Sequence, residues 1–142
     1  MTTTRPPVTI VEADVAEHFP GIVGLYRALG WTHASDPARL RTAVEHSSFA
    51  AVAVEGERVV GFARAMSDEA FAVYIADILV SPDRQRQGIG RALVETLLDH
   101  YPMDRFHHQV LVAERGAEGF YRRVGLVPVT AYGLTAFIRA RR

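Results

Sequence analysis

The alternation of hydrophobic and polar residues changes near residue 80, and the change predicts a strand followed by a helix. Residues 74–80 are YIADILV, an almost continuously apolar run that is rich in β-branched side chains and ends at Ser81-Pro82. Apolar residues on both faces favour a central strand covered on both sides. From Gly88 onward the apolar positions follow helical spacing, at Leu93, Val94, Leu97 and Leu98.

The same criteria predict elements on both sides of this strand and helix. Ahead of it we expect a strand at 8–11, a helix opened by Pro20 and closed by Gly30, a helix capped by Ser35 or Asp36, and strands at 49–54 and 59–66. After it we expect a strand at 109–113, a short helix at 114–123, and a final strand pair at 126–130 and 134–138. Helices among mostly antiparallel strands predict an α+β fold with a mixed sheet.

Length and composition narrow the class of protein. The chain has 142 residues, enough for one domain over 1–142, with residues 1–7 expected to be loose. Sixteen basic residues balance sixteen acidic ones, which argues against a nucleic-acid partner. The absence of cysteine excludes disulfides and thiolate nucleophiles. No apolar run has the length of a membrane span and the first residues lack a signal-peptide core, so we expect a cytoplasmic protein.

The six histidines show no metal-ligand spacing, so we expect no metal. His107 and His108 are adjacent, and on a strand they would point to opposite faces.

Two glycines at the predicted helix start suggest an anion site. The first amides of a helix have no intrahelical partner, and the helix dipole makes that end partly positive. Gly88 and Gly90 lack a Cβ, so a phosphate could approach the backbone closely, and Arg86 and Arg91 add positive charge. The pattern is equally that of a strand-to-helix turn that merely requires glycine. It matches neither the Gly-Lys-Ser/Thr loop nor the dinucleotide fingerprint, whose third glycine is replaced by Leu93.

Two motifs resemble one enzyme family. Gln85-x-x-Gly88-x-Gly90, set between an apolar strand and a helix, resembles the acyl-CoA loop of the GNAT superfamily of N-acyltransferases. Residues 117–126, AEGFYRRVGL, are similar to that family's A-x-x-F-Y-x-x-x-G-F segment, with Leu126 in place of phenylalanine. The resemblance begins near Phe49. It implies a mostly antiparallel sheet with helices on both faces and a central strand that splays from its neighbour.

The resemblance implies an N-acetyltransferase that uses acetyl-CoA and a primary amine, by direct attack of the amine on the thioester. Family members often form homodimers. An extended pantetheine chain can add to a strand edge, where a backbone amide can also stabilise an oxyanion. The residues that the resemblance assigns to acetyl-CoA are Ile78, Leu79, Val80, Gln85, Arg86, Gln87, Gly88, Ile89, Gly90, Arg91 and Glu114, the last standing where many members carry asparagine.

Two side chains are candidates for acid–base chemistry. Tyr121 matches the tyrosine of the family's Phe-Tyr pair, and a neutral phenol can protonate a departing thiolate. The alternative is an aromatic core residue. Asp77 is the one charge in an apolar strand, where a carboxylate is costly unless it is paired or its pKa rises. It is therefore either a general base or the ion-pair partner of Arg64, and both interpretations remain open.

The acceptor is less constrained. Arg64-Ala65-x-Ser67-Asp68, followed by residues 77–80, resembles plastid arylalkylamine (serotonin-type) acetyltransferases and their small bacterial relatives. Tyr26 and Trp31 would then line an acceptor pocket, because aromatic walls suit an aryl amine. Alternatively, both pack a helix onto the sheet. A further hypothesis is an acyl-CoA-binding sensor module without turnover.

Overall fold

The computed structural model describes residues 4–139. The chain divides into two compact units, with the boundary between Val112 and Ala113. Each unit has its own elements, and the expectation of a single domain over 1–142 stays a prediction. Residues 4–7 contain no helix or strand, and the remainder of the segment expected to be loose, residues 1–3, lies outside the described residues. Within 4–139, none of the helices has both the length and the apolar character needed to cross a membrane.

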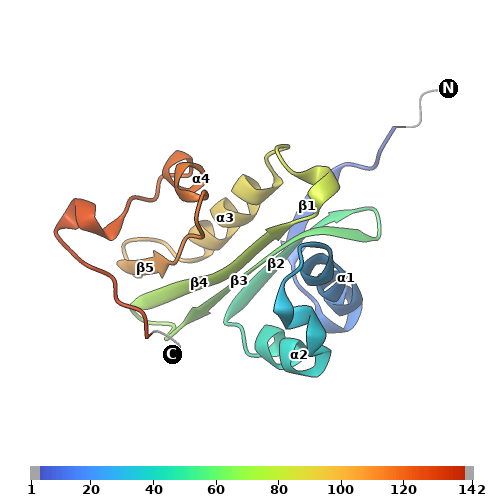
Figure 1. Ribbon diagram of the computed structural model, residues 1–142, viewed down its shortest axis with the longest axis horizontal. Coiled ribbons are helices and arrows are strands. Elements are labelled where there is room, and N and C mark those ends of the chain that lie inside the picture. The colour runs from blue at the N-terminus through green and yellow to red at the C-terminus, as the bar shows by residue number, and fades with distance from the viewer. Residues whose placement is uncertain (1–3, 140–142) are drawn as a thin grey trace. The chain divides into compact units, whose positions relative to one another are not determined.

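The first unit is built on a five-stranded mixed sheet with the order β1-β2-β3-β4-β5 (Figure 1). The strands are β1 Val8–Glu12, β2 Phe49–Glu55, β3 Arg58–Ser67, β4 Ala72–Val80 and β5 His108–Leu111. Strands β1 to β4 pair antiparallel in succession, and β5 pairs parallel with β4. The sheet is therefore mixed and mostly antiparallel, as the sequence predicted.

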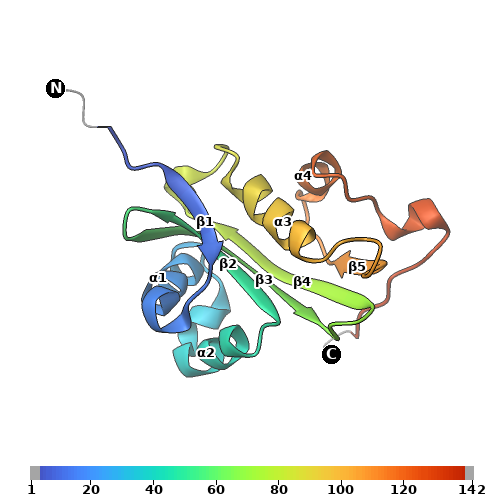
Figure 2. The ribbon, with the colours of Figure 1, turned by 180° about the vertical axis from the view of Figure 1, so that it is seen from behind.

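Helices cover both faces of this sheet (Figures 1 and 2). Helices α1 (Val15–Ala28) and α2 (Pro37–Glu45), with the short 3₁₀ helix η1 (Thr32–Ser35), pack on one face, and α3 (Ile89–His100) packs on the other. Gly61 of β3 lies beneath α3. A Cβ there would approach Leu93 Cδ1 to 2.9 Å and Ile89 Cγ2 to 3.1 Å. Glycine at this position lets the start of α3 lie directly on the sheet.

The end of β3 and the turn to β4 contain Ser67 and Asp68, two residues of the second sequence resemblance. Asp68 Oδ1 accepts hydrogen bonds from the amides of Ala70, Phe71 and Ala72, at 2.8–2.9 Å. These three bonds lower the pKa of the Asp68 carboxyl. The Ser67 hydroxyl donates to the Ala72 carbonyl at 2.7 Å. The Ser67-Asp68 pair thus closes the turn that starts β4, which is a structural role.

The prediction that Pro20 opens the first helix was wrong. Helix α1 begins at Val15, and Pro20 lies inside it. Asp14 is the N-cap, and its carboxylate accepts the Glu17 amide at 3.3 Å. An acidic cap followed three residues later by glutamate is a helix-start signal, so the sequence contained the correct boundary. For α2 the predicted alternative Asp36 is the cap.

The predicted final strand pair was also wrong. The second unit contains α4 (Glu118–Arg123) and the 3₁₀ helix η3 (Val129–Tyr132), and residues 113–139 form no strand. Gly133, expected to turn a hairpin, instead closes η3 in the left-handed region. Alternating apolar residues specify a strand only where a neighbouring edge accepts their backbone hydrogen bonds, and an isolated hairpin is marginally stable.

Candidate active site

An open edge of β4 is the first component of the site. Strand β5 pairs with β4 only from Ala72 to Ile75, so within the described residues the second half of β4 pairs with β3 alone. The Ser81 amide donates to the Val60 carbonyl of β3 at 2.8 Å. Backbone groups alternate sides along a strand, so the amide and carbonyl of Ile78 point away from β3. This is the splay that the family resemblance implied.

A β-bulge in the β3–β4 pair lies at the point where β4 stops pairing with β5. Arg64 lies opposite Asp77 and Ala65 lies opposite Ile75, so Ala76 is an extra residue on β4. A bulge bends the strand and increases its twist. The divergence from β5 therefore begins at the bulge.

The start of α3 is the second component. Gly88 is the N-cap with a φ of 83°, and a Cβ added there would meet no atom within 4 Å. The first helix amide with an acceptor is that of Ala92, which donates to the Gly88 carbonyl at 3.0 Å. Within residues 4–139, no protein acceptor receives the amides of Gly88, Ile89, Gly90 and Arg91. Unpartnered amides at the positive end of a helix, with open space around Gly88, are an arrangement that suits a diphosphate.

The side chains of this loop have different environments. Gln85 Nε2 donates to the Val80 carbonyl at 3.2 Å, which ties the loop to the end of β4. Ile89 is buried in the core, so only its backbone is available to a ligand. Arg91 Nε contacts Glu95 at 2.7 Å. Arg86 and Gln87 are exposed, and Arg86 has a φ of 65°, a strained conformation for a residue with a Cβ.

An ion-pair network holds the loop in this conformation. Arg84, which is buried, makes two 2.8 Å hydrogen bonds to the carboxylate of Glu55, the last residue of β2. Arg58 makes two more, of 2.9 and 2.8 Å, to Asp83. Hydrogen bonds from the arginines lower the pKa of both Glu55 and Asp83. Two bidentate pairs thus fix the segment before Gly88 to the hairpin, and sequence reasoning missed them.

We expect Glu55→Gln to weaken coenzyme A binding by about tenfold, because the loop loses one anchor and its amides no longer converge. Calorimetry with coenzyme A measures the change. Glu57→Gln is the matched control, because Glu57 is an exposed acid two residues further on, in the β2–β3 turn, and forms no ion pair within residues 4–139. Pantetheine, which lacks the diphosphate, should bind both variants equally. An equal loss for pantetheine would assign Glu55 to general stability instead.

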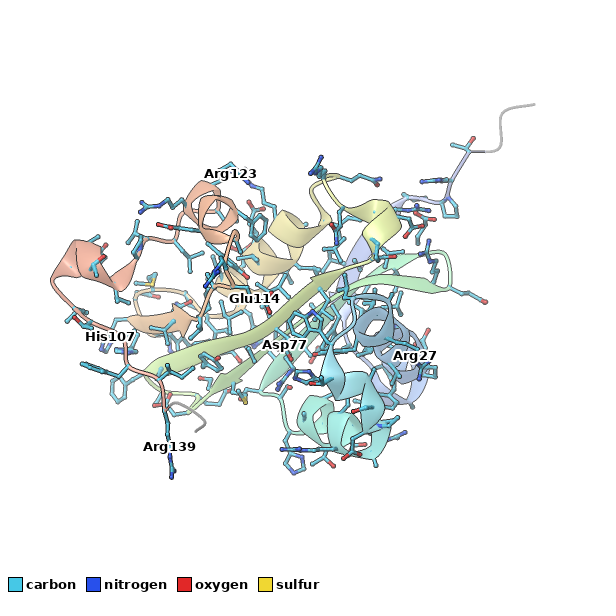
Figure 3. The ribbon with its side chains drawn as sticks, in the orientation of Figure 1. Arg27, Asp77, His107, Glu114, Arg123 and Arg139 are labelled. Atoms are coloured by element: carbon cyan, nitrogen blue, oxygen red, sulfur yellow. The ribbon has the colours of Figure 1, made fainter. Side chains whose placement is uncertain are left out.

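Asp77 lies in a buried hydrogen-bonded network between β4 and α1 (Figure 3). Its Oδ2 accepts hydrogen bonds from the Tyr26 hydroxyl at 2.6 Å and from Arg64 Nε at 2.7 Å. Burial, together with the Asp77 charge, raises the pKa of the Tyr26 phenol far above its usual value, so Tyr26 is a neutral donor. The ion pair with Arg64, one of the two alternatives for Asp77, is present in the structure. A base role for Asp77 stays a prediction.

Asp77→Asn separates the two roles. An ion-pair role predicts a loss of about 3 kcal/mol in the free energy of unfolding, because Arg64 would be left as an uncompensated, mostly buried charge. Urea denaturation measures this loss. A base role predicts, in addition to this loss, a fall in the turnover of the folded enzyme, which an ion-pair role alone does not predict. Tyr26→Phe should cost less, about 1 kcal/mol, since it removes a single hydrogen bond and leaves the charges paired.

Tyr26 and Trp31 belong to an aromatic cluster beside this network. The Tyr26 ring lies 5.7 Å from the Trp31 ring and 5.0 Å from that of His33. Tyr26 has 0% exposure, so it is a core residue, and its hydroxyl donates a hydrogen bond to Asp77. Trp31, half-buried, packs its edge against Tyr26. The packing of Tyr26 agrees with the alternative that these residues pack a helix onto the sheet. The lining of an acceptor pocket by Tyr26 and Trp31 stays a prediction.

Tyr121 and Glu114 lie in the second unit. Tyr121 is half-buried on α4, with its ring 5.0 Å from that of Phe120. Burial, followed by the charge of Glu114, raises the pKa of the Tyr121 phenol. Glu114 is exposed, and its carbonyl accepts the Ala117 amide at 3.0 Å in the turn before α4. The phenol therefore keeps its proton at neutral pH, as a general acid requires.

The structure also shows a pocket that sequence reasoning did not predict. It has a volume of about 470 Å³ and lies over η1, α2 and Arg64 of β3. The loop at residues 31–35 contributes Thr32, His33 and Ser35 to it, whereas Tyr26 and Trp31, the residues expected to line an acceptor pocket, are not among its lining residues. No group of three or more potential metal ligands occurs among residues 4–139.

A mixed sheet whose fourth strand pairs with the fifth over only half its length, beside a glycine-capped helix start, matches the fold of GNAT acetyltransferases. The chain belongs to the GNAT acetyltransferase family, since the family model "Acetyltransferase (GNAT) family" matches residues 22–126. A GNAT family acetyltransferase from Streptococcus pneumoniae superposes with a TM-score of 0.82 at 30% identity, over 96% of this chain and 99% of that one.

Curated relatives include two plant proteins. GCN5-related N-acetyltransferase 1, chloroplastic, from Arabidopsis thaliana is 34% identical over 83% of this chain, which spans 61% of that protein. Serotonin N-acetyltransferase 2, chloroplastic, from Oryza sativa subsp. japonica is 36% identical over 73% of this chain, which spans 54% of that protein. The chain thus spans less than two thirds of the length of these relatives.

Proposed function

We propose that this protein transfers an acetyl group from acetyl-CoA to a small primary amine. The observation that carries the proposal is the open edge of β4 next to four unpartnered amides at the start of α3, in a chain of the GNAT family. The amides of Gly88 to Arg91 would bind the diphosphate of the donor. The free backbone groups of Ile78 would bind its pantetheine arm and the thioester carbonyl.

The chemistry follows from the groups available. The amine nitrogen forms a bond to the acyl carbon, the carbon–sulfur bond breaks, and the departing thiolate takes the proton of the Tyr121 phenol, the role that the family resemblance gives this residue. The attached nitrogen then loses its extra proton, which returns to the Tyr121 phenolate through water and restores the phenol. The products are an N-acetyl amide and free coenzyme A. The chain has no cysteine, so an acyl-cysteine intermediate is excluded and direct attack is the expected route. An alkyl ammonium has a pKa of about 10, so a base or water must first remove its proton.

An assay of thiol release from acetyl-CoA with a panel of amines tests the proposal. The panel includes arylalkylamines, amino acids, polyamines and amino sugars, and mass spectrometry identifies the acetylated product. We expect amine-dependent release of coenzyme A with at least one class. Binding of acetyl-CoA by calorimetry, with no release in any reaction, would contradict the enzymatic proposal and support the sensor module.

A further inference from the structure

Three apolar side chains form a row across neighbouring strands of the sheet. They are Met66 of β3, Tyr74 of β4 and Val110 of β5. Met66 lies opposite Tyr74, and Tyr74 lies opposite Val110, so the three are direct neighbours across the sheet (Figure 1). Met66 and Tyr74 are each 38% exposed, and Val110 is half-buried. We call these three residues the apolar row.

Register and side-chain contacts place the apolar row on the face of the sheet where α1 packs. Side chains two residues apart on a regular strand share a face, and so do side chains directly opposite on neighbouring strands. Met66 is two residues from Arg64, whose Nη1 lies 4.0 Å from the Met66 sulfur. Arg64 Nε donates to Asp77 Oδ2, which also accepts the Tyr26 hydroxyl of α1. The apolar row therefore continues this face beyond the part that α1 covers.

The exposure of the apolar row is unusual for a sheet. Among the described residues, the core beneath α1 and α2 takes Val52, Phe62 and Leu79 from the sheet, and the apolar row is not part of it. A sheet face that meets water normally carries polar residues. Adjacent apolar side chains that stay exposed on a rigid surface are typical of a binding site. Since the row contains no charged side chain, it suits the hydrocarbon part of a ligand.

The apolar row lies where β4 leaves β5. The pairing of β4 with β5 stops at Ile75, the residue after Tyr74, and the extra residue Ala76 of the bulge follows. Ile78, whose free backbone groups would hold the thioester, is four residues beyond Tyr74 on the same strand. A strand rises about 3.3 Å per residue, so the Cα atoms of Tyr74 and Ile78 are at most about 13 Å apart. An amine at the thioester can therefore extend its carbon skeleton along β4 toward the row.

We propose that the apolar row binds the hydrocarbon part of the acceptor, so that the preferred substrates are primary amines with an apolar aryl or alkyl body. This inference rests on the proposed acetyl transfer. The flexible thioether of Met66 and the ring of Tyr74 both pack well against hydrocarbon groups. Polyamines and amino sugars fit poorly, because a second ammonium or a set of hydroxyls would lose hydration on this surface without gaining a partner.

Two amines that differ only in a phenyl group test the inference. We compare kcat/KM for phenethylamine and for ethylamine, with acetyl-CoA as donor. For the unmodified protein we expect a ratio of about 30 in favour of phenethylamine, because the ring is removed from water against the row. Met66→Gln keeps the length of the side chain but makes it polar, and should reduce the ratio by about fivefold, mainly through a higher KM for phenethylamine. Met66→Leu should keep the ratio, because the surface stays apolar.

The matched control is Met103→Gln, which makes the same change at a 65% exposed methionine between α3 and β5, outside the sheet, and should leave the ratio unchanged. A ratio is insensitive to the fraction of folded enzyme, so partial unfolding does not imitate the expected result. A ratio near 1, a ratio that Met66→Gln leaves unaltered, or turnover confined to polyamines and amino sugars overturns the role of the apolar row while acetyl transfer stands. Failure of every amine to release coenzyme A instead overturns the acetyl transfer, and the acceptor site with it.

Discussion

Replacing Tyr121 with phenylalanine is expected to lower kcat by about 100-fold while the affinity for coenzyme A changes less than twofold. Proton donation by a positioned side chain contributes about 100-fold to 10,000-fold to turnover, and phenylalanine keeps the ring but loses the proton. Single-turnover kinetics with acetyl-CoA measure the first quantity, and calorimetry measures the second. Tyr132→Phe is the control, since Tyr132 is a 76% exposed tyrosine of the same unit.

The pH dependence gives a second test of Tyr121. Burial, with the charge of Glu114, raises the pKa of this phenol above its usual value of about 10. A raised pKa means that the neutral, proton-donating form persists to higher pH. Turnover should therefore not fall on the alkaline side until the pH exceeds about 10, and that fall should be missing in Tyr121→Phe. Unchanged turnover in this variant would remove Tyr121 from the mechanism.

Replacing Gly88 with glutamate is expected to weaken coenzyme A binding by about 100-fold. The added carboxylate would lie at the helix start among the four unpartnered amides, where it would repel the diphosphate and occupy its donors. The loss corresponds to roughly 2.7 kcal/mol of binding free energy. Calorimetry with coenzyme A measures it. Pantetheine, which has no diphosphate, should be affected far less.

Two control variants separate charge from backbone strain. Gly88 has a φ of 83°, which any side chain resists, so Gly88→Gln carries the strain and the bulk without the charge. Gly133→Glu carries the charge and similar strain, at a φ of 71°, in the other unit. We expect most of the affinity loss in Gly88→Glu alone. Equal losses in Gly88→Gln and Gly88→Glu would show that the loop conformation, and not the charge, governs binding.

The sequence predictions were reliable in segments whose hydrophobic pattern matches their burial in the folded protein. The run 74–80 is apolar on both faces because β4 lies between α1 and α3, and its pattern required no further information. The loop from Gln85 to Gly90 was found because glycine at a helix start and an adjacent strand are local features. Residues 126–138 have the alternation of strands but form none, because a strand also needs an edge with which to pair.

The candidate site shows the same division. Local sequence marked the loop residues and singled out Asp77 as an anomalous charge. It could not choose between base and ion pair, because the choice depends on Arg64 thirteen residues away and on Tyr26 fifty-one residues away. It missed the anchors Glu55 and Arg84, which lie on separate elements, and the pocket that Arg39 and Arg64 share.

The sequence by itself determined most of the elements of the first unit and the chemistry that each short segment could carry, because periodicity, capping and glycine positions act over a few neighbouring residues. Only the tertiary structure decided which of these groups meet. The β-bulge at Ala76, the ion pairs behind Gly88 and the arginines over the sheet all arise from strand register and helix packing. Register and packing depend on contacts between residues far apart in the chain, and no local pattern records them.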